Sequence, residues 1–162
     1  DGSNARRITR GTEAESDPAW SPTGTWIAFV RNIVNTPVRE IWLIHPNGAG
    51  AHMLTSLAHS VSSPAWSPTG KELAFSSDAR GGHFAIYTIT VAGKNLQPVS
   101  ATGVDSFGPA WSPDGKTISF QRNGSIVTVP LGAGEESVLT NPTDNDSSPA
   151  WNPIQATVGK GY

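Results

Sequence analysis

The stretch Pro109-Ala110-Trp111-Ser112-Pro113-Asp114-Gly115 decides the fold of this chain, because near-copies of it recur along the sequence. Two copies have the wording Pro-Ala-Trp-Ser-Pro-Thr-Gly, at Pro18–Gly24 and Pro64–Gly70, and a shortened copy stands at Pro149–Pro153. The tryptophans of successive copies are 46, 45 and 40 residues apart, at Trp20, Trp66, Trp111 and Trp151. This period is typical of propeller blades and is far longer than a helical or heptad repeat.

The composition favours short strands joined by tight turns. The 162 residues include 13 prolines and 17 glycines, and only 15% of the residues are charged. Proline and glycine interrupt helices but serve the turns between strands. The composition therefore predicts an all-β fold.

Composition also excludes several classes of partner and chemistry. The formal net charge is −2, and the longest run of basic residues is the pair Arg6-Arg7, so no basic stripe is available for nucleic acid. The chain has no cysteine, which excludes disulfides, cysteine-ligated zinc and a thiol nucleophile. No apolar run approaches the length of a membrane span, so no transmembrane segment is expected.

We call the Pro-Ala-Trp copies anchors. Each of the first three anchors is followed by two apolar strand-like stretches. After the first anchor these are Trp26–Val30 and Glu40–Ile44, which are apolar on both faces, as expected for a sheet packed between two neighbours. The same order returns later, at Glu72–Phe75 with Ala85–Ile89 and at Ile118–Phe120 with Ile126–Val129. In the third unit, Asn123-Gly124 predicts a two-residue hairpin, because both residue types accept a positive φ.

The repeat is incomplete at both limits of the sequence. Arg6–Thr9 matches the last strand of a unit, as in Ala51–Thr55, and is expected to form such a strand, while the fourth unit stops after an inner strand around Trp151. We therefore expect a single partial β-propeller over residues 1–162, of about three to four four-stranded blades. Self-association, with Ile154–Tyr162 at the junction, or a longer parent chain would complete it.

The Pro-Ala-Trp-Ser-Pro-Asp/Thr-Gly-Lys wording resembles the WD-like repeat of the TolB propeller family. The resemblance implies that the segment entering each anchor is the innermost strand at the channel, that the tryptophan is in the blade core, and that the last strand lies on the rim. It further implies a periplasmic or extracellular location. Family members include a periplasmic protein that docks small lipoproteins and the propeller lids of prolyl-oligopeptidase-like peptidases.

The candidate binding residues lie where the repeats differ from one another. The fold leaves the segments before the anchors free to vary at the channel mouth, so function can be encoded there. The alternative is that these are solvated loops whose side chains cap turns. Trp26 is added because its equivalents, Glu72 and Thr117, are polar; a partner contact competes there with local packing. The candidates are Glu15, Asp17, Trp26, Asp105, Ser106, Phe107, Asp146 and Ser147.

No catalytic or metal-binding pattern stands out. The sequence has no nucleophile elbow, no glycine-rich loop before a helix and no recurring acid pair, so we expect no enzyme and no cofactor. His45, His52 and His59 recur every seven residues but fall on different elements, so no zinc site is predicted. Asp144 and Asp146 lack the spacing of a calcium loop.

These observations predict a non-enzymatic binding or scaffold module that engages a protein or peptide at the channel mouth. Two alternatives from other classes are a propeller lid of a prolyl-oligopeptidase-like peptidase and a lectin-like propeller. The fold alone does not decide between them.

Overall fold

In the computed structural model, which describes residues 3–132 and 134–152, the chain forms three four-stranded antiparallel sheets, here called blades 1 to 3. Blade 1 consists of β1 (Glu15–Trp20), β2 (Ile27–Asn32), β3 (Arg39–Ile44) and β4 (His52–Met53). Blade 2 consists of β5 (Val61–Trp66), β6 (Glu72–Ser77), β7 (Ala85–Thr90) and β8 (Gln97–Pro98). Blade 3 consists of β9 (Ser106–Trp111), β10 (Thr117–Arg122), β11 (Ser125–Pro130) and β12 (Ser137–Val138).

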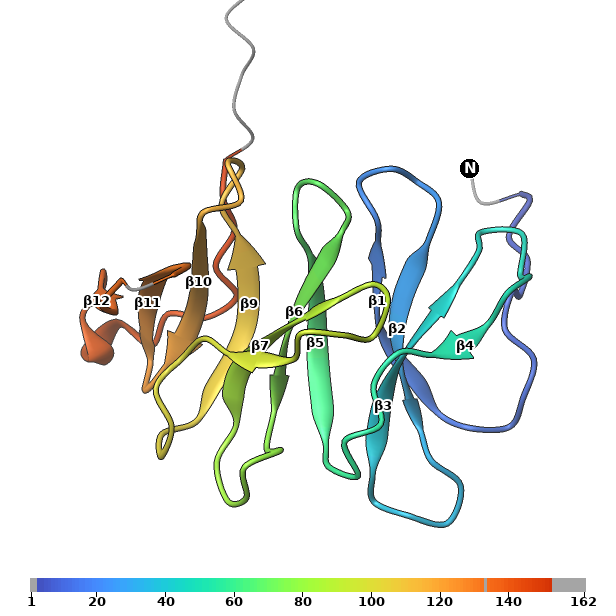
Figure 1. Cartoon of the computed structure of the whole chain (residues 1–162), viewed down its shortest axis with the longest axis horizontal. Helices are drawn as coiled ribbons and strands as arrows, with labels where there is room; N and C mark the ends of the chain where they lie inside the picture. Colours follow the sequence, from blue (N-terminus) through green and yellow to red (C-terminus); the bar gives the residue numbers. More distant parts are fainter. Residues whose placement is uncertain (1–2, 133, 153–162) are drawn as a thin grey trace, which may run out of the picture.

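The blades stand side by side in sequence order (Figure 1), and their inner strands are neighbours, β1 beside β5 and β5 beside β9. The one helical element in the described part of the chain is a short 3₁₀ turn, η1 (Pro142–Asp144). The all-β prediction of a partial propeller is confirmed.

The two ends of each blade carry different connections (Figure 1). At one end, here called the tight-turn end, the Ser-Pro-x-Gly turns join each inner strand to the next strand. At the other, the long-loop end, lie the β2–β3 loop, the β6–β7 loop and the segments that enter β5 and β9. Asn123 and Gly124 form the predicted hairpin there, with φ of 51° and 75°.

Each Ser-Pro-x-Gly turn closes on its own serine. In the first turn the Gly24 N–H donates to the Ser21 carbonyl at 2.9 Å, and Gly24 has a φ of 70°, which favours glycine. The Ser21 hydroxyl accepts from the Trp26 N–H at 3.0 Å. Ser67 and Ser112 accept equivalent bonds in the later turns, at 3.1 and 2.9 Å. This bonding explains why serine and glycine recur at these positions.

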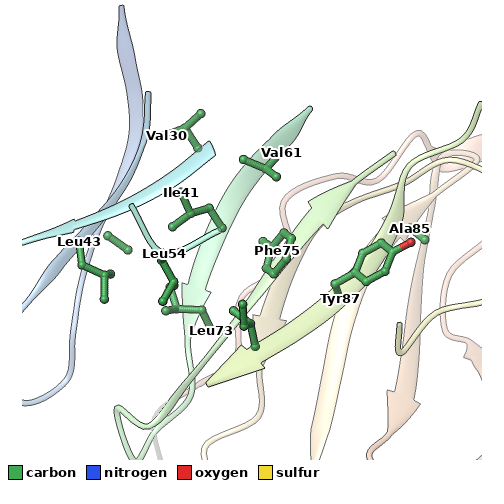
Figure 2. Packing of buried hydrophobic residues seen from close by; sticks show 11 residues of the cluster. Val30, Ile41, Leu43, Leu54, Val61, Leu73, Phe75, Ala85 and Tyr87 are labelled. Carbon is green, nitrogen blue, oxygen red and sulfur yellow. The ribbon is translucent and has the colours of Figure 1, made fainter. Parts of the chain in front are cut away.

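Side chains on the strands alternate between two faces of each blade. We call the face toward the preceding blade the leading face and the other the trailing face. The core between blades 1 and 2 joins one trailing face to one leading face (Figure 2): Ala28, Val30, Ile41 and Leu43 from blade 1, with Leu73, Phe75, Tyr87 and Ile89 from blade 2. A second core joins Ala74 and Ile86 to Ile118, Phe120, Val127 and Val129.

The trailing faces become more polar from blade 1 to blade 3. Strand register identifies the equivalent positions, which are Ala28, Val30, Ile41 and Leu43 in blade 1, Ala74, Ser76, Ile86 and Thr88 in blade 2, and Ser119, Gln121, Ile126 and Thr128 in blade 3. The Ser76 hydroxyl is buried without a hydrogen-bond partner in the part of the chain that the structure describes. The trailing face at the second interface is therefore less apolar than the trailing face at the first.

A repeated hydrogen bond links the blades through the anchor tryptophans. The indole Nε1–H of Trp66 donates to the Ala19 carbonyl at 2.9 Å, and that of Trp111 donates to the Ala65 carbonyl at 3.1 Å. Trp151 repeats the bond to Ala110 at 3.1 Å. We call this series the Trp–Ala ladder; each tryptophan reaches the blade before its own.

The ladder corrects the expectation that every anchor tryptophan lies in the core of its own blade. Trp111 is 8% exposed, but Trp20 is 61% exposed, and Trp151 is also exposed. The position is an interface position, so its burial depends on a preceding blade. Trp20 has no preceding blade in the described part of the chain.

The strand expected at Arg6–Thr9 is absent, because no described strand lies beside this segment to pair with it. Ile8 nevertheless packs on Ile27, Phe29 and Ile44 on the leading face of blade 1. Leu54 belongs to the core that includes the leading face of blade 2, so the two residues are structural equivalents. The repeat alignment was right about position but wrong about hydrogen bonding.

The fourth unit also lacks the expected inner strand, since Asp146–Asn152 forms no described strand. Ser148 still has a φ of 53°, which repeats the positive φ of Asp17, Ser63 and Gly108 before the other anchors. Together with the Trp151 bond, this places the fourth anchor against blade 3. The expected junction segment, Ile154–Tyr162, lies outside the described residues.

A buried acid fixes the connection between blades 1 and 2. Glu40 is 2% exposed, and its Oε2 accepts from the Thr55 hydroxyl at 2.5 Å. Its Oε1 accepts from the N–H groups of Leu57 and Ala58 at 2.8 and 3.0 Å. Ala58 has a φ of 56°, so Glu40 holds this connection in a conformation that a non-glycine residue rarely adopts.

Candidate functional site

The candidate residues do not form one cluster. Trp26 is at the tight-turn end, whereas Glu15, Asp105 and Phe107 lie at the long-loop end, where the inner strands begin. One surface cannot include both groups. The long-loop end is the better candidate for the channel mouth, because most candidate residues lie there.

Trp26 is occupied by its neighbours. The His45 ring stacks on its indole with centroids 3.8 Å apart and 22° between planes, and His52 meets it edge-on at 5.3 Å. His45 Nδ1 lies 2.9 Å from the Thr25 carbonyl, and His52 Nδ1 lies 2.8 Å from the Gly50 carbonyl. One face of the indole is therefore covered, which favours the local packing role for Trp26.

Glu15 and Asp17 are engaged in contacts within the protein. The Arg31 guanidinium donates to Glu15 Oε1 at 2.6 Å and lies over the ring of Trp42 at 4.4 Å. Asp17 accepts from the Ser63 N–H of blade 2 at 3.0 Å. Glu15 thus holds Arg31 within blade 1, and Asp17 links blade 1 to blade 2. Less of the hydrogen-bonding capacity of both carboxylates therefore remains for a partner.

Asp105 and Phe107 meet two residues of the β6–β7 loop. The Asp105 carboxylate accepts from the Phe84 N–H at 2.8 Å, and His83 Nδ1 lies 3.3 Å from the same oxygen. The rings of Phe84 and Phe107 are 5.0 Å apart and tilted by 39°. Both rings are half-buried and therefore keep part of their surface accessible at the long-loop end. We call these four residues the aromatic site.

Ser106 cannot contact a partner in this conformation, because it is 0% exposed. Its hydroxyl accepts from Arg122 Nε at 2.9 Å. The Arg122 guanidinium also binds both carboxylate oxygens of Glu136, and Glu136 accepts from the Ala101 N–H at 2.6 Å. Ser106 thus belongs to a network that ties the start of β9 to the rim of blade 3.

The same network changes the acidity of Glu136. Partial burial of the carboxyl raises its pKa. The hydrogen bonds from Arg122 and Ala101 and the positive charge of Arg122 lower the pKa by a larger amount, so the pKa of Glu136 is below its ordinary value. A depressed carboxyl pKa stabilises the folded state above the unfolded-state pKa of about 4.3 and loses this effect as pH falls through the folded-state pKa.

Glu136→Gln should therefore lower the melting temperature most above about pH 5, with the difference from wild type shrinking as the pH falls towards about 3. Thermal unfolding followed by circular dichroism across this range measures the difference. Glu135→Gln, at the exposed neighbouring acid, is the matched control and should show little change. A Glu136→Gln effect that is equal at all pH values would contradict the assignment.

Asp146 and Ser147 lie beside the hairpin of blade 3. The Asp146 N–H donates to the Gly124 carbonyl at 2.8 Å, and Ser147 is exposed. Neither side chain joins the aromatic site through a contact seen in the structure. They remain predicted binding residues.

No group of three or more histidine, cysteine, aspartate or glutamate residues within 3–132 and 134–152 is arranged to hold a metal ion. Of the three spaced histidines, His45 and His52 both contact Trp26. His59 lies at the opposite end, with its Nδ1 3.6 Å from an Asp78 carboxylate oxygen. The spacing of seven therefore brings two of the rings to one side chain but not all three.

The residues that sequence analysis missed are His83 and Phe84. They lie in a loop that the third unit replaces with the Asn123-Gly124 turn. The β6–β7 loop of the second unit is longer than the matching turn of the third unit. This added length could have pointed to His83 and Phe84, since an added loop is free to carry function.

Fold and repeat together define a β-propeller. A family model described as the TolB beta propeller domain matches residues 3–158, and the chain belongs to this family. No curated protein matches the sequence. The described residues include no helix long and apolar enough to cross a membrane.

Solved structures share the fold. TolB from Acinetobacter baumannii is 24% identical with a TM-score of 0.71, over 87% of this chain and 36% of its own. A putative TolB from Agrobacterium tumefaciens is 19% identical with a TM-score of 0.57, over 84% of this chain and 65% of its own. A puromycin-hydrolyzing peptidase from Mycobacterium tuberculosis is 20% identical with a TM-score of 0.64, over 80% of this chain and 22% of its own. The chain thus spans less than two thirds of the length of each of these relatives.

Proposed function

We propose that this protein is a non-enzymatic binding module that engages a protein or peptide at the long-loop end. The aromatic site carries the proposal: two partly accessible phenylalanine rings stand together where an inner strand begins. Aromatic side chains are enriched in the energetically dominant parts of protein interfaces, because they bury a large area at a small cost in side-chain entropy.

The aromatic site is held in place by the backbone. Besides the Asp105 bond to the Phe84 N–H, the Ser106 N–H donates to the Phe84 carbonyl at 2.8 Å. The β6–β7 loop is thereby tied to β9 of the next blade on both sides of Phe84. Such pre-organisation lowers the entropy lost on binding and favours a recognition role over a merely solvated loop.

The proposal includes a periplasmic or extracellular location, which membership of the TolB propeller family supports. It also includes completion of the propeller, either by self-association into an oligomer or filament or by a longer parent chain. A role as the propeller of a peptidase remains the alternative, favoured by the structural similarity to the puromycin-hydrolyzing peptidase.

Replacing Phe84 and Phe107 with serine should reduce capture of a specific partner from a bacterial envelope extract by about tenfold or more, because hot-spot aromatic residues carry much of an interface's energy. Captured proteins are quantified by mass spectrometry, and the main one is then purified and its affinity measured. Val34→Ser is the matched control, since Val34 is 60% exposed in the β2–β3 loop of the same end.

Equal capture by the wild type and the double variant would reject the aromatic site. A captured peptidase domain would support the alternative function, and binding to a glycan array with no protein captured would support the lectin-like one. Thermal melts of all variants establish that the blades remain folded.

A further inference from the structure

A polar cleft opens between blades 2 and 3 at the tight-turn end. It has a volume of about 370 Å³ and lies between the trailing face of blade 2 and the leading face of blade 3. Blade 2 supplies Glu72, Thr88 and Gln97 to its lining, and blade 3 supplies Trp111 and Val129. The cleft belongs to the contact between these two blades and does not depend on where the row of blades begins or ends.

The equivalent hollow between blades 1 and 2 stays at the rim. Strand register pairs the positions as Trp26 with Glu72, Leu43 with Thr88, and His52 with Gln97. A hollow of about 380 Å³ is present there, but it is lined by β4, Leu54 and the β7–β8 turn, and neither Trp26 nor Leu43 lines it. The Trp26 indole, stacked on His45, packs against the core and fills the space that the smaller Glu72 leaves open.

The polar side chains of the cleft are free to bind a ligand. Within residues 3–132 and 134–152, no hydrogen bond or ion pair engages the side chain of Glu72, Thr88 or Gln97. Together they offer a carboxylate, a hydroxyl oxygen and an amide oxygen, which all accept hydrogen bonds. A few unengaged polar groups in a cleft with an apolar wall are typical of a small-molecule site.

The lining favours an organic cation over a sugar. A hydrogen bond from a cationic N–H group to a carboxylate is roughly twice as strong as one between neutral groups. The planar fork of N–H donors in a guanidinium suits several acceptors at once, and an apolar stem can lie along Val99 and Val129. Trp111 is 8% exposed, so its indole does not present an open face on which a sugar ring would stack.

We propose that this cleft binds a small organic cation through a guanidinium group placed on the Glu72 carboxylate. The Thr88 hydroxyl and the Gln97 amide oxygen accept from the remaining N–H groups, and the apolar part of the ligand contacts Trp111 and Val129. A free guanidino compound and the arginine side chain of a partner carry the same group, and two probes distinguish these sources. The cleft is at the tight-turn end, so the proposal is independent of the aromatic site.

Titration of the isotope-labelled protein with butylguanidinium, followed by NMR, tests the proposal. The indole N–H signal of Trp111 should shift with a dissociation constant of about 1 mM or lower, and that of Trp20 in blade 1 should not shift. Butylurea, an uncharged analogue of similar shape, should bind about tenfold more weakly or less. Acetyl-arginine amide carries the guanidinium on a peptide backbone: its binding would identify an arginine side chain as the ligand, and binding of butylguanidinium alone would identify a free cation.

Glu72→Gln should raise the dissociation constant about tenfold or more, because it removes the charge and keeps the size of the side chain. Glu72→Trp restores the residue of the first interface and should abolish binding by filling the cleft. Asp144→Asn removes a negative charge from an exposed position in η1 and should leave binding unchanged. Thermal melts establish that the variants fold, and the nearly isosteric Glu72→Gln keeps the test decisive if Glu72→Trp disturbs the interface.

Absence of a Trp111 shift up to about 20 mM butylguanidinium, or equal binding of butylurea, would overturn the inference. Equal weakening by Glu72→Gln and Asp144→Asn would also overturn it, since binding would then follow the net charge of the protein and not the cleft. The double serine variant of Phe84 and Phe107 should bind the probe as wild type does. Failure of this inference therefore leaves the proposed function standing, and the reverse also holds.

Discussion

Replacing Trp111 with alanine is expected to lower the free energy of unfolding by about 3 to 5 kcal/mol. Trp111 is 8% exposed and belongs to the core between blades 2 and 3. The substitution removes the indole from that core and leaves the Ala65 carbonyl without its donor, and both losses act against the folded state. Urea unfolding followed by circular dichroism measures the change.

Trp20→Ala is the matched control, because it makes the same chemical change at the equivalent repeat position. Trp20 is 61% exposed, so at concentrations where the protein is monomeric its loss should cost under about 1 kcal/mol. Trp111→Phe should fall between the two, since the ring is kept and the hydrogen bond is lost. A Trp111→Ala effect below about 1 kcal/mol would show that the interface contributes little.

Glu40→Ala should destabilise the protein by about 3 kcal/mol, although it removes a buried charge. Glu40 accepts three hydrogen bonds, and alanine would leave the N–H groups of Leu57 and Ala58 buried or partly buried without that acceptor. The positive φ of Ala58 would also lose its support. Urea unfolding at neutral pH measures the loss.

Glu40→Gln separates the hydrogen bonds from the charge. The glutamine side-chain oxygen can still accept from the Leu57 and Ala58 N–H groups, so the expected loss is about 1 kcal/mol. Equal losses for alanine and glutamine would mean that the negative charge, and not the hydrogen-bond pattern, stabilises the connection. Glu15→Gln, at a half-buried acid paired with Arg31, provides a comparison at the same end of blade 1.

Much of the fold could be predicted because comparison of the repeat copies shows which residues recur at each position. Ser21, Ser67 and Ser112 each bond within their own turn, so local sequence was sufficient to predict the turns. The Asn123-Gly124 hairpin is likewise a local structure. The apolar strands were found because both faces of a stacked blade exclude water.

Burial of the tryptophans could not be predicted from one unit, because it depends on the next unit in space. Trp20 and Trp111 occupy the same repeat position, but Trp111 packs on a preceding blade and Trp20 has none among the described residues. The aromatic site escaped prediction for a similar reason. Phe84 and Phe107 are brought together from two blades by backbone bonds between a loop and an inner strand, which no sequence spacing records.

The increasing polarity of the trailing faces has a consequence for how the molecule opens. In a row of units that contact only their neighbours, cooperativity depends on the strength of each interface. The trailing face at the interface between blades 1 and 2 is apolar, whereas the trailing face at the next interface contains Ser76 and Thr88. Amide protons of blade 3 should therefore exchange with solvent through partial opening, while those of blades 1 and 2 exchange together in a larger and rarer unfolding event.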